Sequence, residues 1–160
     1  MKTTLKYITT ILAVLILSNC RGIYEDSTEL ASDYKASVNS ISVADLNAKI
    51  EKGESFNLLD VRQPDDFNTD NIPGSVSMPR GDVEFHISDS TFWSSQYMFP
   101  PEKSDVIIVY SGDGNLGILS AVTLKQLGYK NVFNLDGGYK AYNPNKDPNA
   151  KPKTSGGCGG

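Results

Sequence analysis

Short apolar runs alternate with helix-like patterns through the middle of the chain. Residues 56–61 (FNLLDV), 106–110 (VIIVY) and 132–135 (VFNL) are too short for helices and are typical of buried strands. A further short strand is expected around Val76. Because helical patterns separate these runs, the sequence predicts an α/β domain with a mainly parallel sheet.

Helix signals lie between the predicted strands. Ser42 and Asp45 have the spacing of a capping box, which predicts a helix that ends near Gly53. Pro64 suits the first position of the next helix. A third helix is expected to run from the glycine-rich loop after VIIVY to Leu127. The aromatic-rich stretch 81–101 predicts an irregular helix that covers the sheet.

The N-terminus has the pattern of an export signal. Two lysines precede the apolar run 7–17, which is too short to cross a bilayer and is typical of a secretory signal. The run leads into LSNC, which resembles the lipobox of bacterial lipoproteins, so residues 1–19 are expected to be removed and Cys20 to be acylated. An ordinary cleaved signal with a chance cysteine is the alternative. Acyl chains on Cys20 would anchor the protein to a membrane of the bacterial cell envelope, facing the periplasm or the surface.

Composition divides the rest of the chain into three parts. Residues 20–39 are polar and acidic, which suits a tether, residues 40–142 form the predicted domain, and residues 143–160 are expected to be a flexible tail. The formal net charge is −4, so no basic patch suggests a nucleic-acid partner. If Cys20 is acylated, the second of the two cysteines, Cys158 in the tail, is a lone thiol.

Three glycines after VIIVY have the spacing of a dinucleotide-binding loop. Gly112, Gly114 and Gly117 spell G-x-G-x-x-G, and Asp136 ends the following strand. This motif normally begins its domain, whereas here only 24 residues follow Asp136. Dinucleotide binding is therefore the less favoured interpretation.

The order of segments resembles the rhodanese-like domain. The matching pieces are ISVADLNAKI, LLDVRQPDDF, DNIPGSVSMP, VIIVYSGDGNLG and LGYKNVFNLDGGYKAY, which together cover most of residues 40–142. The resemblance implies a central, mainly parallel five-stranded sheet flanked by helices. It also implies that the loop after VIIVY is the active-site loop.

In that loop this chain departs from the active members of the family. Ser111 takes the place of the nucleophilic cysteine, Leu116 takes the place of a basic residue, and Asp113 adds a carboxylate. An anionic substrate would then meet like charge and no loop cation. The expected binding loop comprises Ser111, Gly112, Asp113, Gly114, Asn115 and Leu116, and no catalytic residue, metal or cofactor is expected.

Asp60, Arg62 and His86 each have two possible roles. Asp60 and Arg62 follow a strand, where we expect them to brace the domain rather than to act in catalysis. The chain's one histidine, His86, could in principle activate Ser111 as a general base, although a lone histidine is more often structural.

The sequence therefore predicts a membrane-anchored rhodanese-like domain without standard thiosulfate sulfurtransferase activity. We expect it to act as a binding or scaffold module for an envelope protein or a small molecule. The alternative is a sulfurtransferase or sulfur carrier that uses Cys158. Treated as a random coil, the 16 residues from Tyr142 to Cys158 span about 20–24 Å, enough to reach the loop.

Overall fold

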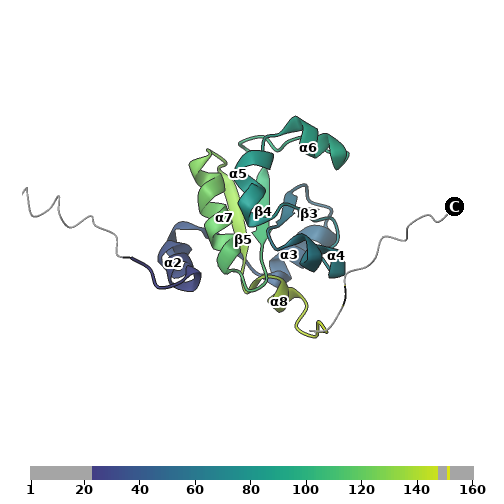
Figure 1. Cartoon of the computed structure of the whole chain (residues 1–160). Helices are drawn as coiled ribbons and strands as arrows, with labels where there is room; N and C mark the ends of the chain where they lie inside the picture. The colour runs from purple at the N-terminus through teal and green to yellow at the C-terminus, as the bar shows by residue number, and fades with distance from the viewer. Residues whose placement is uncertain (1–22, 148–150, 152–160) are drawn as a thin grey trace, which may run out of the picture.

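The computed structural model describes residues 23–147 and residue 151, and Figure 1 shows their arrangement. Its strands are β1 (Asn39–Ile41), β2 (Asn57–Asp60), β3 (Val76–Ser77), β4 (Val106–Tyr110) and β5 (Asn131–Leu135). Its α-helices are α2 (Ser27–Tyr34), α3 (Val43–Glu51), α4 (Pro64–Thr69), α5 (Val83–His86), α6 (Ser90–Ser95), α7 (Asn115–Gln126) and α8 (Gly138–Tyr142). Two short 3₁₀ helices are η1 (Lys35–Ser37) and η2 (Arg80–Asp82).

The strands form one sheet in the order β1-β5-β4-β2-β3, and every pairing among the described residues is parallel. This confirms the predicted α/β class and the five-stranded sheet. The register places Asp60 opposite Tyr110, so β2 and β4 end side by side. The loops that follow these two strands therefore meet at one edge of the sheet.

Helices cover both faces of the sheet, and each face has its own hydrophobic core. On β4, Ile107 and Val109 face the core that contains residues of α2, α5, α6 and α7. Ile108 and Tyr110 face the opposite core, together with residues of α3 and α8. This alternation follows from the two-residue period of a strand, and burial on both faces explains why VIIVY is apolar throughout.

The predicted helix signals lie at the ends of the observed helices. The Ser42 hydroxyl accepts a hydrogen bond from the Asp45 backbone N–H at 3.1 Å, which caps the start of α3. Pro64 is the first residue of α4. Helix α7 ends just before Gly128, whose φ of +92° is a left-handed conformation that glycine adopts without a steric penalty.

The predicted tether is wrong for much of its length. Residues Ser27–Tyr34 form α2, which packs against α7, and Ala31 is fully buried in the core beneath it. Asp26 caps this helix by accepting from the backbone N–H groups of Thr28 and Glu29. The polar composition hid the helix, because one alanine and a few partly buried side chains are enough to dock it.

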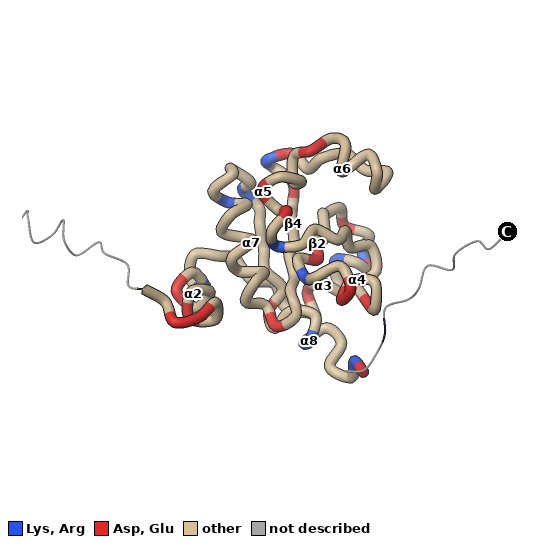
Figure 2. Tube along the Cα trace, viewed as in Figure 1, with Lys and Arg blue, Asp and Glu red and all other residues tan. Residues whose placement is uncertain are grey.

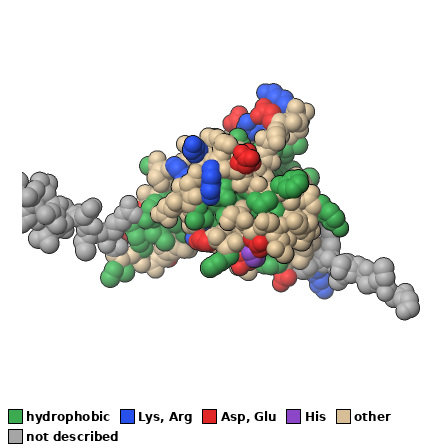
Figure 3. Space-filling view, turned by 90° about the horizontal axis from the view of Figure 1, so that it is seen from above, with side chains coloured by type: hydrophobic (Ala, Val, Ile, Leu, Met, Phe, Trp, Pro, Cys, Tyr) green, Lys and Arg blue, Asp and Glu red, His purple; other side chains and the backbone are tan. Residues whose placement is uncertain are grey.

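The stretch 81–101 contains η2, α5 and α6 rather than one irregular helix. Trp93 is fully buried and its indole N–H donates to the Ile87 carbonyl at 3.0 Å, which fixes α6 against α5. Phe85, Tyr97 and Phe99 remain largely exposed. Figure 3 looks down on the end of the molecule that carries these helices and shows hydrophobic side chains at its surface.

The predicted tail begins later than expected. The side-chain amide of Asn143 donates to the Asp70 carboxylate at 3.1 Å, and the Lys146 ammonium lies 3.4 Å from the Asp66 carboxylate. The first residues after α8 are therefore fixed against α4 and the loop after it. The signal segment 1–19, Cys20 and Cys158 lie outside the described residues. Within the described part of the chain, no helix has the length and apolar character needed to cross a bilayer.

Candidate functional site

A cleft of about 660 Å³ lies where the loops after β2 and β4 meet α8. Five segments line it: the start of α2, the β2–α4 connection with the first turn of α4, the β4–α7 loop with the first turn of α7, α8, and the residues that follow α8. The lining residues are Ser27, Thr28, Arg62, Gln63, Asp66, Gly112, Asp113, Asn115, Leu116, Tyr139, Lys140, Asn143, Pro144 and Lys146. The carboxyl end of a parallel sheet is the usual place for a ligand in this class of fold.

Ser111 follows β4 directly but does not line the cleft. Its side chain is fully buried, and its hydroxyl oxygen accepts a hydrogen bond from the Gly114 backbone N–H at 3.0 Å. Its carbonyl oxygen accepts from the Tyr139 backbone N–H at 2.7 Å. The expected nucleophile position is thus tied into the loop and to α8, with its hydroxyl turned away from solvent.

Backbone conformation and packing explain two glycines that follow β4, Gly114 and Gly117. Gly114 has a φ of +97° and lies against the backbone of Gly137 and Gly138. A Cβ atom at Gly117 would lie 2.1 Å from Oδ1 of Asn134, and one at Gly138 would lie 2.3 Å from the Ser111 carbonyl oxygen. Two of the three glycines that resemble a dinucleotide motif, Gly114 and Gly117, are therefore explained by backbone conformation and by close contacts with β5 and α8, whereas a Cβ atom at Gly112 would meet no atom within 4 Å.

The loop also satisfies some of its own backbone donors. The Asp113 carboxylate accepts from the backbone N–H of Asn115 at 3.0 Å and from its side-chain amide at 3.1 Å. Together with the bond from Gly114 to Ser111, this interaction occupies two N–H groups at the start of α7. An anion bound there would compete with a carboxylate that is already in place.

Asp60 and Arg62 form a buried ion pair beneath the cleft. Arg62 donates from Nε to both Asp60 oxygens, at 2.9 and 3.0 Å, and from Nη2 to Asp60 Oδ2 at 2.6 Å. Nη2 also donates to the Asp70 carbonyl at 2.7 Å, so the pair connects β2 with the residues after α4. Burial alone would lower the pKa of Arg62, but the hydrogen bonds and the negative charge of Asp60 outweigh it and raise that pKa.

Two tyrosines that were not among the predicted site residues hold the arginine in place. The Arg62 guanidinium carbon lies 4.1 Å from the ring centre of Tyr139 and 5.5 Å from that of Tyr110. The Tyr110 hydroxyl accepts from the Ile72 backbone N–H at 3.2 Å and lies 2.9 Å from the Ser75 hydroxyl. Burial, with the nearby charge of Asp60, raises the pKa of Tyr110 well above its usual range.

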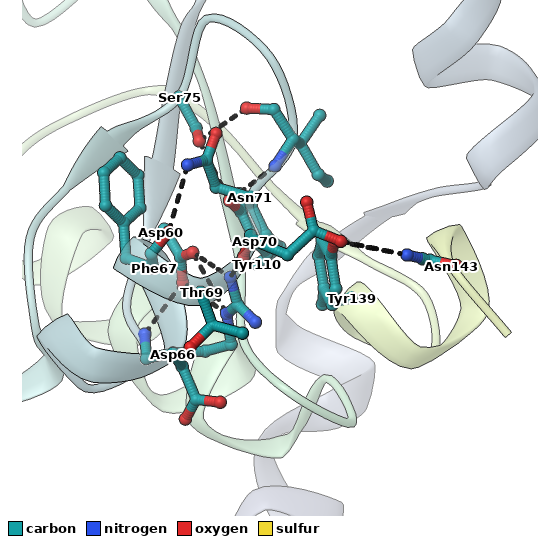
Figure 4. Close-up of polar contacts among 12 residues, drawn as sticks. Asp60, Asp66, Phe67, Thr69, Asp70, Asn71, Ser75, Tyr110, Tyr139 and Asn143 are labelled. Carbon is teal, nitrogen blue, oxygen red and sulfur yellow. Dashed lines mark hydrogen bonds and ion pairs between the residues drawn. The ribbon is translucent and has the colours of Figure 1, made fainter. Parts of the chain in front are cut away.

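Figure 4 shows how this polar network reaches α8. The carboxylate of Asp70 points toward Asn143, and the ring of Tyr139 lies beside it. Burial raises the pKa of the Tyr139 hydroxyl. One continuous set of contacts therefore joins the ends of β2 and β4, the turn before β3, and α8.

The charges around the cleft differ from those expected from the loop alone. Arg62, Lys140 and Lys146 bring three cations to the lining, and Asp66 and Asp113 bring two carboxylates. The sequence prediction concerned the loop alone, where Asp113 adds a carboxylate and Leu116 supplies no cation, and the three cations come from segments outside that loop. Leu116 lines the cleft and is about one third exposed.

His86 is not part of this site. Its ring stacks on Phe92 with centroids 4.8 Å apart. The next residue, Ile87, accepts a hydrogen bond from the hydroxyl of Tyr129, which lies just before β5. His86 thus lies near the amino ends of the strands, while Ser111 lies at their carboxyl ends, so the two residues cannot pair.

Comparisons with known proteins agree with this geometry. A family model described as the rhodanese-like domain matches residues 42–145. A Bacillus subtilis protein named as a sulfur carrier, YrkF, is 29% identical over 112 residues, which are 70% of this chain and 55% of that protein. This chain thus spans about half the length of that relative.

Two further matches cover most of the domain. A Schizosaccharomyces pombe protein named as a mitochondrial thiosulfate sulfurtransferase is 31% identical over 99 residues, which are 61% of this chain and 70% of that protein. The structure of a Rhodopseudomonas palustris protein of unknown function is 28% identical, with a TM-score of 0.64 over 78% of this chain and 93% of its own. From its sheet, its loop after β4 and these matches, the chain belongs to the rhodanese-like family.

Proposed function

We propose that this protein is a ligand-binding rhodanese-like domain without standard thiosulfate sulfurtransferase activity, held at a bacterial envelope membrane by acylated Cys20. The absence of standard sulfurtransferase activity is supported above all by the burial and hydrogen bonding of Ser111. Its side chain is fully buried and its hydroxyl is hydrogen-bonded to the Gly114 N–H.

The chemistry of sulfur transfer supports this proposal. A sulfurtransferase needs a thiolate that attacks a sulfane sulfur and carries it as a persulfide. A serine hydroxyl cannot carry sulfur in this way, and it becomes a nucleophile only beside a general base. The one histidine of the chain lies at the other end of the sheet. The relatives named as a sulfur carrier and a sulfurtransferase share this fold, and we infer that this chain uses the same fold for binding.

The test is turnover by the full chain. We expect no transfer of sulfur from thiosulfate to cyanide, and no change when Cys158 is replaced by serine. Turnover that is lost in Cys158→Ser would instead support the alternative, a sulfur carrier built on the tail. That alternative has one favourable observation, because Pro144 and Lys146, which precede the tail cysteine by 14 and 12 positions, line the cleft.

Reconstruction of the loop provides a positive control. In Ser111→Cys with Leu116→Arg, the Cys thiolate should attack the outer sulfur of thiosulfate and release sulfite, leaving a persulfide that mass spectrometry detects. Ser111→Ala with Leu116→Arg should form no persulfide in the loop. A persulfide on the reconstructed loop would show that only the side chains, and not the backbone, separate this chain from its active relatives. Turnover of thiosulfate by the unmodified chain that persists in Cys158→Ser would contradict the proposal.

A further inference from the structure

Arg62 has one donor edge that the protein does not use. Its Nε and Nη2 atoms donate to Asp60 and to the Asp70 carbonyl, whereas Nη1 has no hydrogen bond to any residue that the structure describes. The side chain is 5% exposed and lines the cleft. A buried guanidinium with a free edge at a cleft is a donor that a ligand can satisfy.

The free edge is held rigidly. Asp60 fixes one side of the guanidinium through two nitrogens, and the rings of Tyr139 and Tyr110 lie 4.1 and 5.5 Å from its central carbon. A side chain fixed in this way loses little conformational entropy when it binds a ligand. Arg62 is thus preorganised as a donor, in addition to bracing the end of β2.

The remaining charges favour one negative charge on the ligand. The two acids of the lining are engaged, Asp66 with Lys146 at 3.4 Å and Asp113 with Asn115 at 3.0 Å. Lys140 lines the same cleft and is exposed. Asp60 pairs with Arg62 and Asp66 pairs with Lys146. Among the described residues Lys140 is thus the lining cation that no acid pairs, and it supplies the charge for one anionic group beside the open Nη1 edge of Arg62. A ligand with several negative charges would not be matched.

The walls favour a ligand with an organic body. Leu116 gives the cleft an apolar wall, and Ser27 and Thr28 of α2 add hydroxyl groups on another side. Helix α2 precedes residues 42–145, which match the family model, so this wall lies outside the matched segment. The cleft volume of about 660 Å³ suits a small molecule.

We propose that the cleft binds a small organic molecule with one oxyanion group, carboxylate or sulfonate, which accepts hydrogen bonds from Nη1 of Arg62 and lies beside Lys140. The β4–α7 loop contributes the apolar surface of Leu116 and not a nucleophile. This inference rests on the proposed binding function and names its ligand class and its specificity-determining residue.

The chain has three arginines, at 21, 62 and 80, which makes a selective measurement practical. In the full chain labelled with ¹⁵N-arginine, titration with benzoate and with benzenesulfonate should shift the Nε–H signal of Arg62 saturably. Arg80, which is paired with Glu84 at 2.8 Å, serves as the internal control and should not respond. Acetate and inorganic sulfate should bind at least several-fold more weakly, because they lack the organic body.

Variants separate the donor from its surroundings. Arg62→Lys keeps a cation beside Asp60 but removes the second nitrogen, and it should weaken benzoate binding by about tenfold or more. Lys140→Gln should weaken binding about two- to fivefold, while Lys130→Gln, a change of another exposed lysine at the far end of β5, should leave it unchanged. If Arg62→Lys does not fold, Lys140→Gln and the arginine signals still decide the question.

Several outcomes would overturn the inference. They are an Arg62 signal that no probe shifts, benzoate affinity that survives both Arg62→Lys and Lys140→Gln, or equal affinity for acetate and benzoate. Sulfur transfer by the unmodified chain would refute the proposed function but leave a measured oxyanion contact at Arg62 intact. The two failures are therefore distinguishable.

Discussion

At the scale of single residues, Tyr110 links the sheet to the turn before β3. It ends β4, is fully buried, and its hydroxyl satisfies the backbone N–H of Ile72, which is also fully buried. The hydroxyl therefore supports the wall of the site without touching the cleft.

Tyr110→Phe tests this role through its pH dependence. The variant leaves the Ile72 N–H unsatisfied, so we expect a loss of about 1–2 kcal/mol in the free energy of unfolding at neutral pH. In the wild type the raised pKa of Tyr110 adds stability that is complete below about pH 10 and is lost as pH rises through the folded-state pKa. The stability difference between the two proteins should therefore narrow above about pH 10.

Urea unfolding at a series of pH values measures both effects. Tyr97→Phe is the matched control, because Tyr97 is 99% exposed and its hydroxyl supports no buried group. That change should alter the free energy of unfolding by less than about 0.5 kcal/mol. A constant difference between wild type and Tyr110→Phe across the alkaline range would contradict the assignment.

Whether a site residue could be predicted from the sequence depended on how far away in the sequence its contacts lie. Asp60 and Arg62 are two positions apart on a strand end, so a short motif was enough to select them. Ser111 was selected by its place in a family loop. Tyr139 and Lys140 could not be found in this way, because their contacts with Arg62 and the cleft depend on how α8 folds back over the loop. The free donor edge of Arg62 could not be predicted either, because it depends on which nitrogens donate to Asp60 and Asp70 in the folded protein.

At the scale of elements, apolar runs predicted the buried strands because those strands are covered on both faces. β1 gave no such signal, since it has three residues of which two are exposed. Helix α2 was missed for a related reason. It is acidic and mostly exposed, and Figure 2 shows the acidic residues that gather on it.

Replacing each of two alanines with glutamate tests whether α2 is part of the folded domain. Ala31→Glu places a carboxylate in the core between α2 and α7, and we expect it to lower the free energy of unfolding by about 2–4 kcal/mol. Ala36→Glu makes the same change at an exposed position and should alter it by less than about 0.5 kcal/mol. Thermal or urea unfolding followed by circular dichroism gives both values. Equal stability of the two variants would mean that α2 is detached in solution.

At the scale of the whole molecule, the proposed anchor is a separate question from the fold. If Cys20 is the acylation site, cells fed a clickable palmitate should label the wild-type chain and fractionate it with membranes. Cys20→Ser should abolish both the label and the membrane association, whereas Cys158→Ser should retain both. Label that persists in Cys20→Ser would remove the lipid anchor from the proposal.

The early start of α2 limits how far such an anchored domain could travel. With α2 rigid from Ser27, residues 21–26 alone would separate the lipidated cysteine from the folded body, and six residues span at most about 20–22 Å. Glu25, Asp26, Glu29 and Asp33 would meet anionic head groups and be repelled within a Debye length of about 8–10 Å. An acylated form of the protein would therefore keep its folded domain within a thin layer of water next to the bilayer, and any ligand or partner would have to reach it there.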